Sequence, residues 1–387
     1  MQASTPCTPT SGHIGTIFVT IELSQRSWLM TVHSPDRDRI SRHKLEGGDL
    51  AGLLALIETV RTRAERKLCY RPSVVSCYEA GYDGFWLHRA LLAAGIANHV
   101  FDPASIAVEQ RRRRVKTDRI DGELLLRTLM AHCRGEPRAV RVVHVPSEDA
   151  EDARRMSRER GRLITEQSAH VARIKALLRL HGLSAGNPRR RDWLSQLARQ
   201  RDWQSDPVPP QLAAELKREH ARLMLVGEQL EALAEEAADA APASAATAQM
   251  IERRDLLQRF KGVGPVFAGT FASEVFYKDF RNRREVAAYF GLAPSPWRSG
   301  KTEREQGISK AGNPRARHKA IELAWLWLRH QPDSALSQWF RSRMVNASGR
   351  IKRIAIVALA RKLVVALWRH LSTGLLPDGA VLSMRNA

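Results

Sequence analysis

Cysteine is scarce in this 387-residue chain, and its four cysteines are not arranged for a joint role. Cys7, Cys69, Cys77 and Cys133 form no C-x-x-C pair, which argues against a zinc ribbon and a disulfide-stabilised secreted domain. No apolar run reaches the roughly 20 residues of a membrane span. The first residues also lack the basic start and apolar run of a signal peptide. We therefore expect a cytoplasmic protein with no membrane partner.

Acidic residues are in the minority, and the excess positive charge is unevenly distributed. The chain has 62 Lys and Arg against 41 Asp and Glu, a formal net charge of +21. Residues 251–387 alone hold 25 basic and 10 acidic residues, and so carry +15 of that charge. Because basic side chains release counterions from a phosphate backbone, this balance favours nucleic acid as a partner.

Residues 14–146 are predicted to form an α/β domain after a disordered lead-in, residues 1–13. Strand candidates lie at 14–23, 27–32, 39–46, 73–81, 96–103 and 139–146. Helical patterns lie at 49–67, 83–95 and 118–133. Three successive strands followed by alternating helices and strands predict a mixed sheet with helices on its faces.

The rest of the chain is predicted to be mainly helical. Residues 147–250 hold two long charged segments with helical periodicity around a proline-rich break, typical of two antiparallel coiled-coil-like helices. Residues 251–387 form the third predicted region. It has a turn between two helices at Gly262 and Gly264, a Gly-rich basic loop containing Ser299, and two closing helices at 315–330 and 351–371.

Four carboxylates of the predicted α/β domain are spaced so that they can converge. Glu22 lies in the otherwise apolar first strand, and Glu79 ends the fourth strand. Asp118 and Asp121 share one helix face at a spacing of three residues. Four converging carboxylates repel one another unless cations neutralise them, and oxygen ligands suit Mg²⁺ or Mn²⁺. Two such ions can stabilise the attacking and leaving oxygens in phosphodiester chemistry.

A simpler interpretation remains open for each residue alone. An aspartate pair on a helix is usually a solvated face or a favourable charge near the helix N-terminus, and Glu79 could be an exposed strand end. Glu22 is harder to explain in this way, because burying an unpaired carboxylate is costly. The combination is therefore more specific than any of its parts.

Several motifs resemble those of a known family. Four segments are similar to the DEDD-type transposases of the insertion-sequence one-ten family: CYEAGYDGFWLHRALLAAG, RRRRVKTDRIDGELLLRTL, LLQRFKGVGPVFAGTFASEV and YFGLAPSPWRSGKTEREQGISKAGNPRARHKAIELAW. The resemblance covers nearly the whole chain and implies a ribonuclease-H-like (RuvC-like) fold, as in Holliday-junction resolvases. It implies that Glu79, Asp118 and Asp121 match three of the four family acids. The fourth is usually aspartate, whereas this chain has Glu22, whose side chain is one methylene longer.

The resemblance also implies a role for Ser299 that the residues alone do not predict. A serine beside a glycine is usually a turn or cap residue, and no neighbouring histidine or lysine is an obvious activating base. The family carries a nucleophilic serine in an S-G motif, which Ser299 and Gly300 match. The resemblance thus implies a composite site, joined across subunits, in which the serine forms a covalent phosphoserine link to DNA while the acidic domain supplies metal.

Basic residues near these positions are the predicted nucleic-acid contacts. Arginines before the aspartates would hold a phosphate backbone near the metals, and cations around Ser299 suit phosphate. The 261–265 turn resembles a helix–hairpin–helix whose N–H groups bind phosphate, although a simple turn between helices is equally consistent. The predicted contacts are Arg111, Arg112, Arg113, Arg114, Lys116, Lys261, Gly262, Gly264, Lys301, Arg304, Lys310, Arg315 and Arg317.

Together these features predict a transposase, a DNA recombinase of a mobile element that acts on double-stranded DNA with a divalent metal. The resemblance adds a guide RNA transcribed from the element's own ends, and the helical middle favours a homodimer or tetramer. Two alternatives stay open. One is a junction-selective endonuclease with the same acids and no serine chemistry. The other is an inactive copy that only binds nucleic acid, which Glu22 keeps open.

Overall fold

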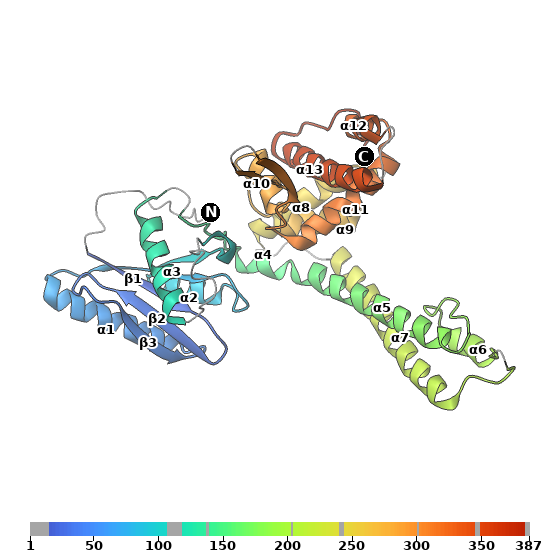
Figure 1. Cartoon of the computed structure of the whole chain (residues 1–387), viewed down its shortest axis with the longest axis horizontal. Helices are drawn as coiled ribbons and strands as arrows, with labels where there is room; N and C mark the ends of the chain where they lie inside the picture. Colours follow the sequence, from blue (N-terminus) through green and yellow to red (C-terminus); the bar gives the residue numbers. More distant parts are fainter. Residues whose placement is uncertain are drawn as a thin grey trace. The chain divides into compact units, whose positions relative to one another are not determined.

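The computed structural model describes residues 15–106, 118–136, 139–202, 204–239, 244–299, 302–344 and 349–383. For residues 118–120, 238–239, 296–299 and 302–306 only the backbone is described. The chain divides into two compact units, Met1–Val145 and Pro146–Ala387 (Figure 1). The first unit is α/β and the second is mostly helical, which confirms the predicted fold class at that level. No described helix is long and apolar enough to cross a membrane.

The first unit is built on a five-stranded mixed sheet with the strand order β3-β2-β1-β4-β5. Neighbours β1, β2 and β3 are antiparallel, whereas β1, β4 and β5 run parallel. The predicted meander followed by alternating helices and strands is therefore confirmed. The elements are β1 (Thr16–Glu22), β2 (Ser27–His33), β3 (Ser41–Glu46), α1 (Leu50–Leu68), β4 (Ser73–Glu79), α2 (Trp86–Ala93), β5 (Ala97–Phe101), the 3-10 helix η1 (Pro103–Ser105) and α3 (Asp118–Cys133).

Helices cover both faces of this sheet. α1 and α2 pack on one face, against a cluster that includes Val19 and Ile21. α3 packs on the other face, against a cluster that includes Phe18 and Cys77. Apolar side chains on both faces of β1 explain why its sequence is almost continuously apolar, as expected of a central strand.

The prediction of a further strand at 139–146 is wrong. Val142 forms only an isolated antiparallel bridge with Phe101. The N–H of Arg141 donates to the hydroxyl of Ser105 (2.8 Å) instead of to a neighbouring strand. Pro146, at the other end of the segment, has no N–H to donate. The apolar residues of this segment therefore lie beside β5 without extending the sheet.

The second unit contains twelve described elements. The long helices α5 and α7 lie antiparallel to each other (Figure 1), with buried leucines and isoleucine between them. The elements are α4 (Glu148–Asp152), α5 (Arg155–Arg179), α6 (Trp193–Ala198), α7 (Pro210–Asp239), α8 (Ala245–Gln258), α9 (Pro265–Glu274), α10 (Arg283–Tyr289), β6 (Pro294–Ser299), β7 (Thr302–Ile308), α11 (Pro314–His330), α12 (Ala335–Met344) and α13 (Gly349–Thr373).

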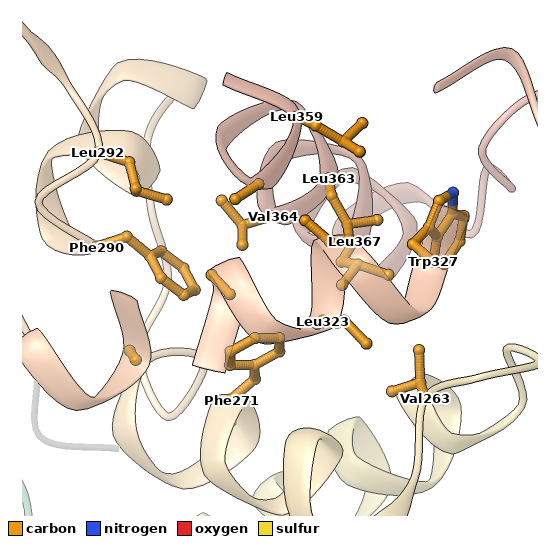
Figure 2. Close-up of a cluster of buried hydrophobic side chains, with 14 of the residues drawn as sticks. Val263, Phe271, Phe290, Leu292, Leu323, Trp327, Leu359, Leu363, Val364 and Leu367 are labelled. Carbon is orange, nitrogen blue, oxygen red and sulfur yellow. The ribbon is translucent and has the colours of Figure 1, made fainter. Parts of the chain in front are cut away.

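The helices α8 to α13 enclose one apolar core (Figure 2). Phe271, Trp327 and Leu363 are fully buried in it. The indole N–H of Trp327 donates to the hydroxyl of Ser334 (2.9 Å), so this large side chain is buried without an unsatisfied donor. The sequence did not predict α12, which lies between the two predicted closing helices.

The segment predicted as a Gly-rich basic loop is instead a β-hairpin. β6 and β7 are antiparallel, with Trp297 opposite Arg304 and Ser299 opposite Thr302. Only Gly300 and Lys301 separate the two strands, and both lie outside the described residues. Two-residue connections with glycine are typical of tight hairpins, so the basic composition had hidden a strand pair.

A buried ionic network connects α5 to this C-terminal core. The carboxylate of Glu274, with only 3% of its side chain exposed, accepts hydrogen bonds from Nε (2.8 Å) and Nη2 (3.1 Å) of Arg158 and from Nδ2 of Asn313 (3.1 Å). Burial alone would raise the pKa of Glu274, but Arg158, then Asn313 and Arg154, lower it overall. Arg154 adds a hydrogen bond to the carbonyl of Ser273 (3.0 Å).

The variant Glu274→Gln should lower the free energy of unfolding by about 2 kcal/mol near pH 7, because a buried charged hydrogen-bond acceptor is lost. The folded-state pKa lies below the ordinary value, so this difference should shrink as the pH falls below the pKa of glutamate in the unfolded chain. Urea denaturation at several pH values measures both effects. The control Glu159→Gln, on the exposed side of α5, should cost less than about 0.5 kcal/mol. Equal losses in the two variants would contradict the role of Glu274.

Candidate active site

The two glutamates occupy equivalent positions at the ends of neighbouring parallel strands. The register pairs Ile21 of β1 with Tyr78 of β4, and the next residues, Glu22 and Glu79, end the two strands. Adjacent strands are about 4.8 Å apart, so the backbones of the two glutamates are close. Since side chains alternate along a strand, both glutamates lie on the face that carries Cys77 and is covered by α3.

The helix α3 approaches this edge closely because Gly122 has no side chain. The carbonyl of Gly122 accepts a hydrogen bond from Oγ1 of Thr20 (3.3 Å). A Cβ atom at Gly122 would lie 2.6 Å from Oγ1 of Thr31 and 3.2 Å from Oε1 of Glu22. Asp121 immediately precedes this contact in the chain. The helix therefore reaches the carboxylate of Glu22 within one residue of Asp121.

The other acids of α3 have different surroundings. Asp118 is the first residue of the helix, and its side chain lies outside the described residues. Asp121 is half-buried. Glu123 forms an ion pair with Arg42 of β3, which helps to hold α3 across the antiparallel half of the sheet. Arg111–Arg114 and Lys116, predicted to guide phosphate to this edge, lie outside the described residues.

The carboxylates offer suitable ligands for a hard cation. Oxygen donors such as those of Glu22, Glu79 and Asp121 are preferred by Mg²⁺ and Mn²⁺. Among the described residues, no group of three or more His, Cys, Asp and Glu side chains is arranged to hold a metal ion. The side chain of Asp118 is not part of that set, so the full predicted quartet is not represented in it.

Uncharged groups lie beside Glu79 on the same sheet face. Burial, then Cys133 and Glu79, raise the pKa of the Cys77 thiol well above its usual value. On β5, His99 lies opposite Cys77, with its ring 4.9 Å from that of His132 on α3. Burial, then His132 and His88, lower the pKa of His99 to about 4. These two groups are therefore neutral near pH 7 and contribute no positive charge to the acidic edge.

The hairpin of the second unit carries Ser299 at the end of β6, next to the two-residue connection. The side chains of Ser299 and Arg304 lie outside the described residues, as does all of Lys301. Lys310, just beyond β7, has a left-handed backbone conformation (φ 56°), and its carbonyl accepts a hydrogen bond from Arg317 (2.9 Å). The structure thus places the serine at an accessible chain position and Lys310 on the exposed surface.

Two predicted phosphate contacts also have structural partners inside the protein. Arg315 donates to the carbonyl and hydroxyl oxygens of Ser157 on α5, and burial lowers the pKa of its guanidinium. In the predicted helix–hairpin–helix turn, the N–H of Lys261 donates to the carbonyl of Val381 (3.1 Å) and that of Val263 to Phe260 (3.0 Å). These donors are therefore already engaged.

The same turn has a packing reason for its first glycine. Gly262 has φ 92°, and a Cβ atom there would lie 2.7 Å from Cβ of His330 at the end of α11. Gly264 instead precedes α9 in an extended conformation and caps that helix with its carbonyl. The observed hydrogen bonds and contacts are those of a close-packed turn between α8 and α9.

Comparison with known proteins adds the family. Residues 254–339 match the profile of the transposase IS116/IS110/IS902 family. The chain is also 47% identical over 377 residues to y4rJ of Sinorhizobium fredii (strain NGR234), a protein named as a transposase, with 95% of each chain covered. The chain belongs to this transposase family.

Two more distant relatives of this transposase agree. It is 28% identical over 376 residues to y4qE of the same organism, also named as a transposase, with 91% of this chain and 87% of the relative covered. It is 24% identical over 288 residues to the transposase for insertion sequence element IS1111A of Coxiella burnetii, with 74% of each chain covered. The family profile spans the hairpin with Ser299 and all of α11. DNA is therefore the substrate class of this transposase.

Sequence reasoning missed Gly122 and the histidine pair. The signal for Gly122 was present, since an isolated glycine inside a helical pattern often marks a close approach of another element. His99 and His132 are far apart in the sequence and have no spacing that announces their contact. Their proximity follows only from the crossing of α3 over β5.

The variant Gly122→Ala should force α3 away from β1 and lower the free energy of unfolding by about 1–3 kcal/mol, as overpacking commonly does. Removing the clashing hydroxyl in Gly122→Ala/Thr31→Ala should restore part of this loss. The control Gly227→Ala introduces a methyl group into open space on α7 and should be neutral or stabilising by up to about 1 kcal/mol. Chemical denaturation followed by circular dichroism measures the changes. Equal stabilities for the Gly122 and Gly227 variants would disprove the close approach.

Proposed function

We propose that this transposase cleaves and rejoins DNA with two sets of groups, the carboxylates of the first unit and the Ser299 hydroxyl of the second. The observation that carries the proposal is the pairing of Glu22 and Glu79 at the ends of neighbouring parallel strands, under the helix that begins with Asp118 and contains Asp121. Buried or crowded carboxylates are costly without a compensating cation. Their retention at one edge is therefore best explained by chemistry.

The carboxylates Glu22, Glu79, Asp118 and Asp121 are the residues that would hold Mg²⁺ or Mn²⁺. Such an ion, when bound, supplies positive charge that stabilises the phosphodiester as negative charge develops on its oxygens. The chain's own contribution is position. The strand ladder fixes the two glutamates, and the contact of Gly122 with Glu22 sets the approach of the helix that carries the aspartates.

Ser299 is the proposed nucleophile. Its Oγ forms a bond to phosphorus while the bond from phosphorus to a deoxyribose oxygen breaks, the leaving oxygen takes up a proton, and the Oγ proton passes to solvent. A deoxyribose hydroxyl of another strand then attacks the phosphoserine, which regenerates the serine and joins the new strand. Each step exchanges one phosphate ester for another, so no external energy source is needed. The position beside a two-residue hairpin connection supports access by a DNA backbone.

The proposal extends to the partners of the reaction. A guide RNA from the element's ends would pair with the DNA, and the chains would act as dimers or tetramers. The net charge of +21 supports a ribonucleoprotein, and the antiparallel pair α5 and α7 offers a surface for self-association.

The variant Ser299→Ala should abolish the covalent protein–DNA adduct, with a loss of at least about 10³-fold, as expected when a nucleophile is removed. Labelled element-end DNA, incubated with protein and Mg²⁺ and run on a denaturing gel, detects the adduct. Ser309→Ala is the matched control, since Ser309 is exposed just beyond β7 and should be dispensable. Strand cleavage that survives in Ser299→Ala would instead identify a junction endonuclease without serine chemistry.

The variant Glu22→Gln should reduce Mg²⁺-dependent cleavage at least about 10²-fold, because it removes a charged ligand while keeping the shape of the side chain. Glu22→Asp, which restores the residue usual in the family, should retain cleavage. Glu46→Gln, at the exposed end of β3 in the same sheet, is the control and should remain active. Cleavage assays with a Mg²⁺ titration make the comparison. Absence of cleavage in both the natural chain and Glu22→Asp would favour a protein that only binds nucleic acid.

A further inference from the structure

The end of the second unit contains a long stretch without any acidic residue. Between Asp333 and Asp378 the sequence has eight Lys and Arg and no Asp or Glu. This stretch comprises α12 and α13, and most of α13 lies beyond the residues that match the family profile. The positive charge of these helices is therefore not compensated by carboxylates of their own sequence.

Two of these cations from different helices share one aromatic ring. The guanidinium of Arg343 on α12 lies 5.0 Å from the ring centroid of Trp339, and Nζ of Lys362 on α13 lies 4.7 Å from it. The indole ring attracts each cation, yet the two like charges repel each other across a short distance. Such an arrangement is best neutralised by an external anion that contacts both.

The same pattern continues toward the start of α13. Nζ of Lys352 lies 5.6 Å from the ring centroid of Trp325 on α11, and this ring packs edge-on against Phe340, the neighbour of Trp339. Glu322, one turn before Trp325, is already paired with Lys319 (2.7 Å) and His318 (3.0 Å). The aromatic residues and cations thus form a continuous surface over three helices.

The outer side of α13 extends this surface along the helix axis. Its inner side is buried in the C-terminal core, as the positions of Leu359, Leu363 and Leu367 show (Figure 2). On the outer side Arg350 and Arg361 are three turns apart, and Lys362 and Arg369 are two turns apart. All four side chains are exposed. They make two rows of cations on the solvent side of one rigid helix.

We propose that this surface, the α12–α13 face, binds the phosphate backbone of double-stranded DNA without reading its sequence. The face consists of Trp325, Trp339, Arg343, Arg350, Lys352, Arg361, Lys362 and Arg369. Duplex DNA is the polyanion that family membership provides, and a regular row of phosphates matches cations held in rows on a helix. The inference deepens the proposed function, on which it rests for its substrate, but it does not depend on the cleavage chemistry.

The test compares DNA binding by the full chain and by Arg343→Gln/Lys362→Gln at several salt concentrations. Fluorescence anisotropy with a labelled duplex of random sequence gives the dependence of the affinity on salt. Each lost phosphate contact lowers the slope of log affinity against log salt by about 1, so the double variant should lower it by about 2. The loss should be the same for a duplex with the element-end sequence.

Two further variants separate charge from folding. Arg189→Gln/Arg191→Gln removes the same charge from exposed residues of the α5–α6 connection and should leave the slope nearly unchanged. Arg343→Lys/Lys362→Arg keeps both charges and should bind as the natural chain does. If Arg343→Gln/Lys362→Gln proves unstable in circular-dichroism melting, Arg361→Gln/Arg369→Gln tests the same face at fully solvent-facing positions.

Three outcomes would overturn the inference. One is an unchanged slope in the face variants, and another is an equal loss in the Arg189/Arg191 control. The third is a loss confined to a hairpin RNA or to vesicles of anionic phospholipid, with duplex DNA binding intact, which would assign the face to that partner instead. The result is independent of strand cleavage, since Ser299→Ala should show the natural slope even if the serine proves not to be the nucleophile.

Discussion

The parallel pairing of β1 with β4 is the constraint on which the acidic edge depends. Parallel strands end at the same side of a sheet, so two strands of equal register bring their last residues together wherever those residues stand in the sequence. Here 56 residues separate Glu22 from Glu79, and α1 occupies most of that interval. The helix between them lies on the opposite face from α3, which leaves the glutamates' face to the helix with the aspartates.

The second unit depends on a different interaction, the burial of Glu274. Its carboxylate collects donors from α5 and from the residue that caps α11, and Arg154 and Arg315 add contacts between α5 and the C-terminal core. The long helix is therefore anchored by charged hydrogen bonds as well as by apolar contacts. Such bonds require a fixed geometry, whereas apolar contacts alone would allow α5 to slide along its groove.

Much of this architecture follows from the sequence, but unevenly. The central strands and the long helices were predictable because apolar periodicity reflects burial directly. The hairpin at 294–308 was not, because two prolines and many charged residues concealed its strands, although the Gly-Lys pair between them is a typical hairpin connection. The neighbouring positions of Glu22 and Glu79 were foreseeable from strand order. The contact at Gly122 required the crossing point of α3, which no local pattern encodes.

The hairpin changes how tolerant the surroundings of Ser299 are to insertions and deletions. A serine in an irregular loop can move by one residue and still face the same side after local adjustment. A serine at the end of a paired strand cannot, because a shift of one residue turns every side chain of that strand to the opposite face. The register of β6 on β7 already contains one irregularity, between Pro294 and Pro296, far from the connection. Length variation is thus accommodated at the base of the hairpin, and the orientation of its tip is preserved.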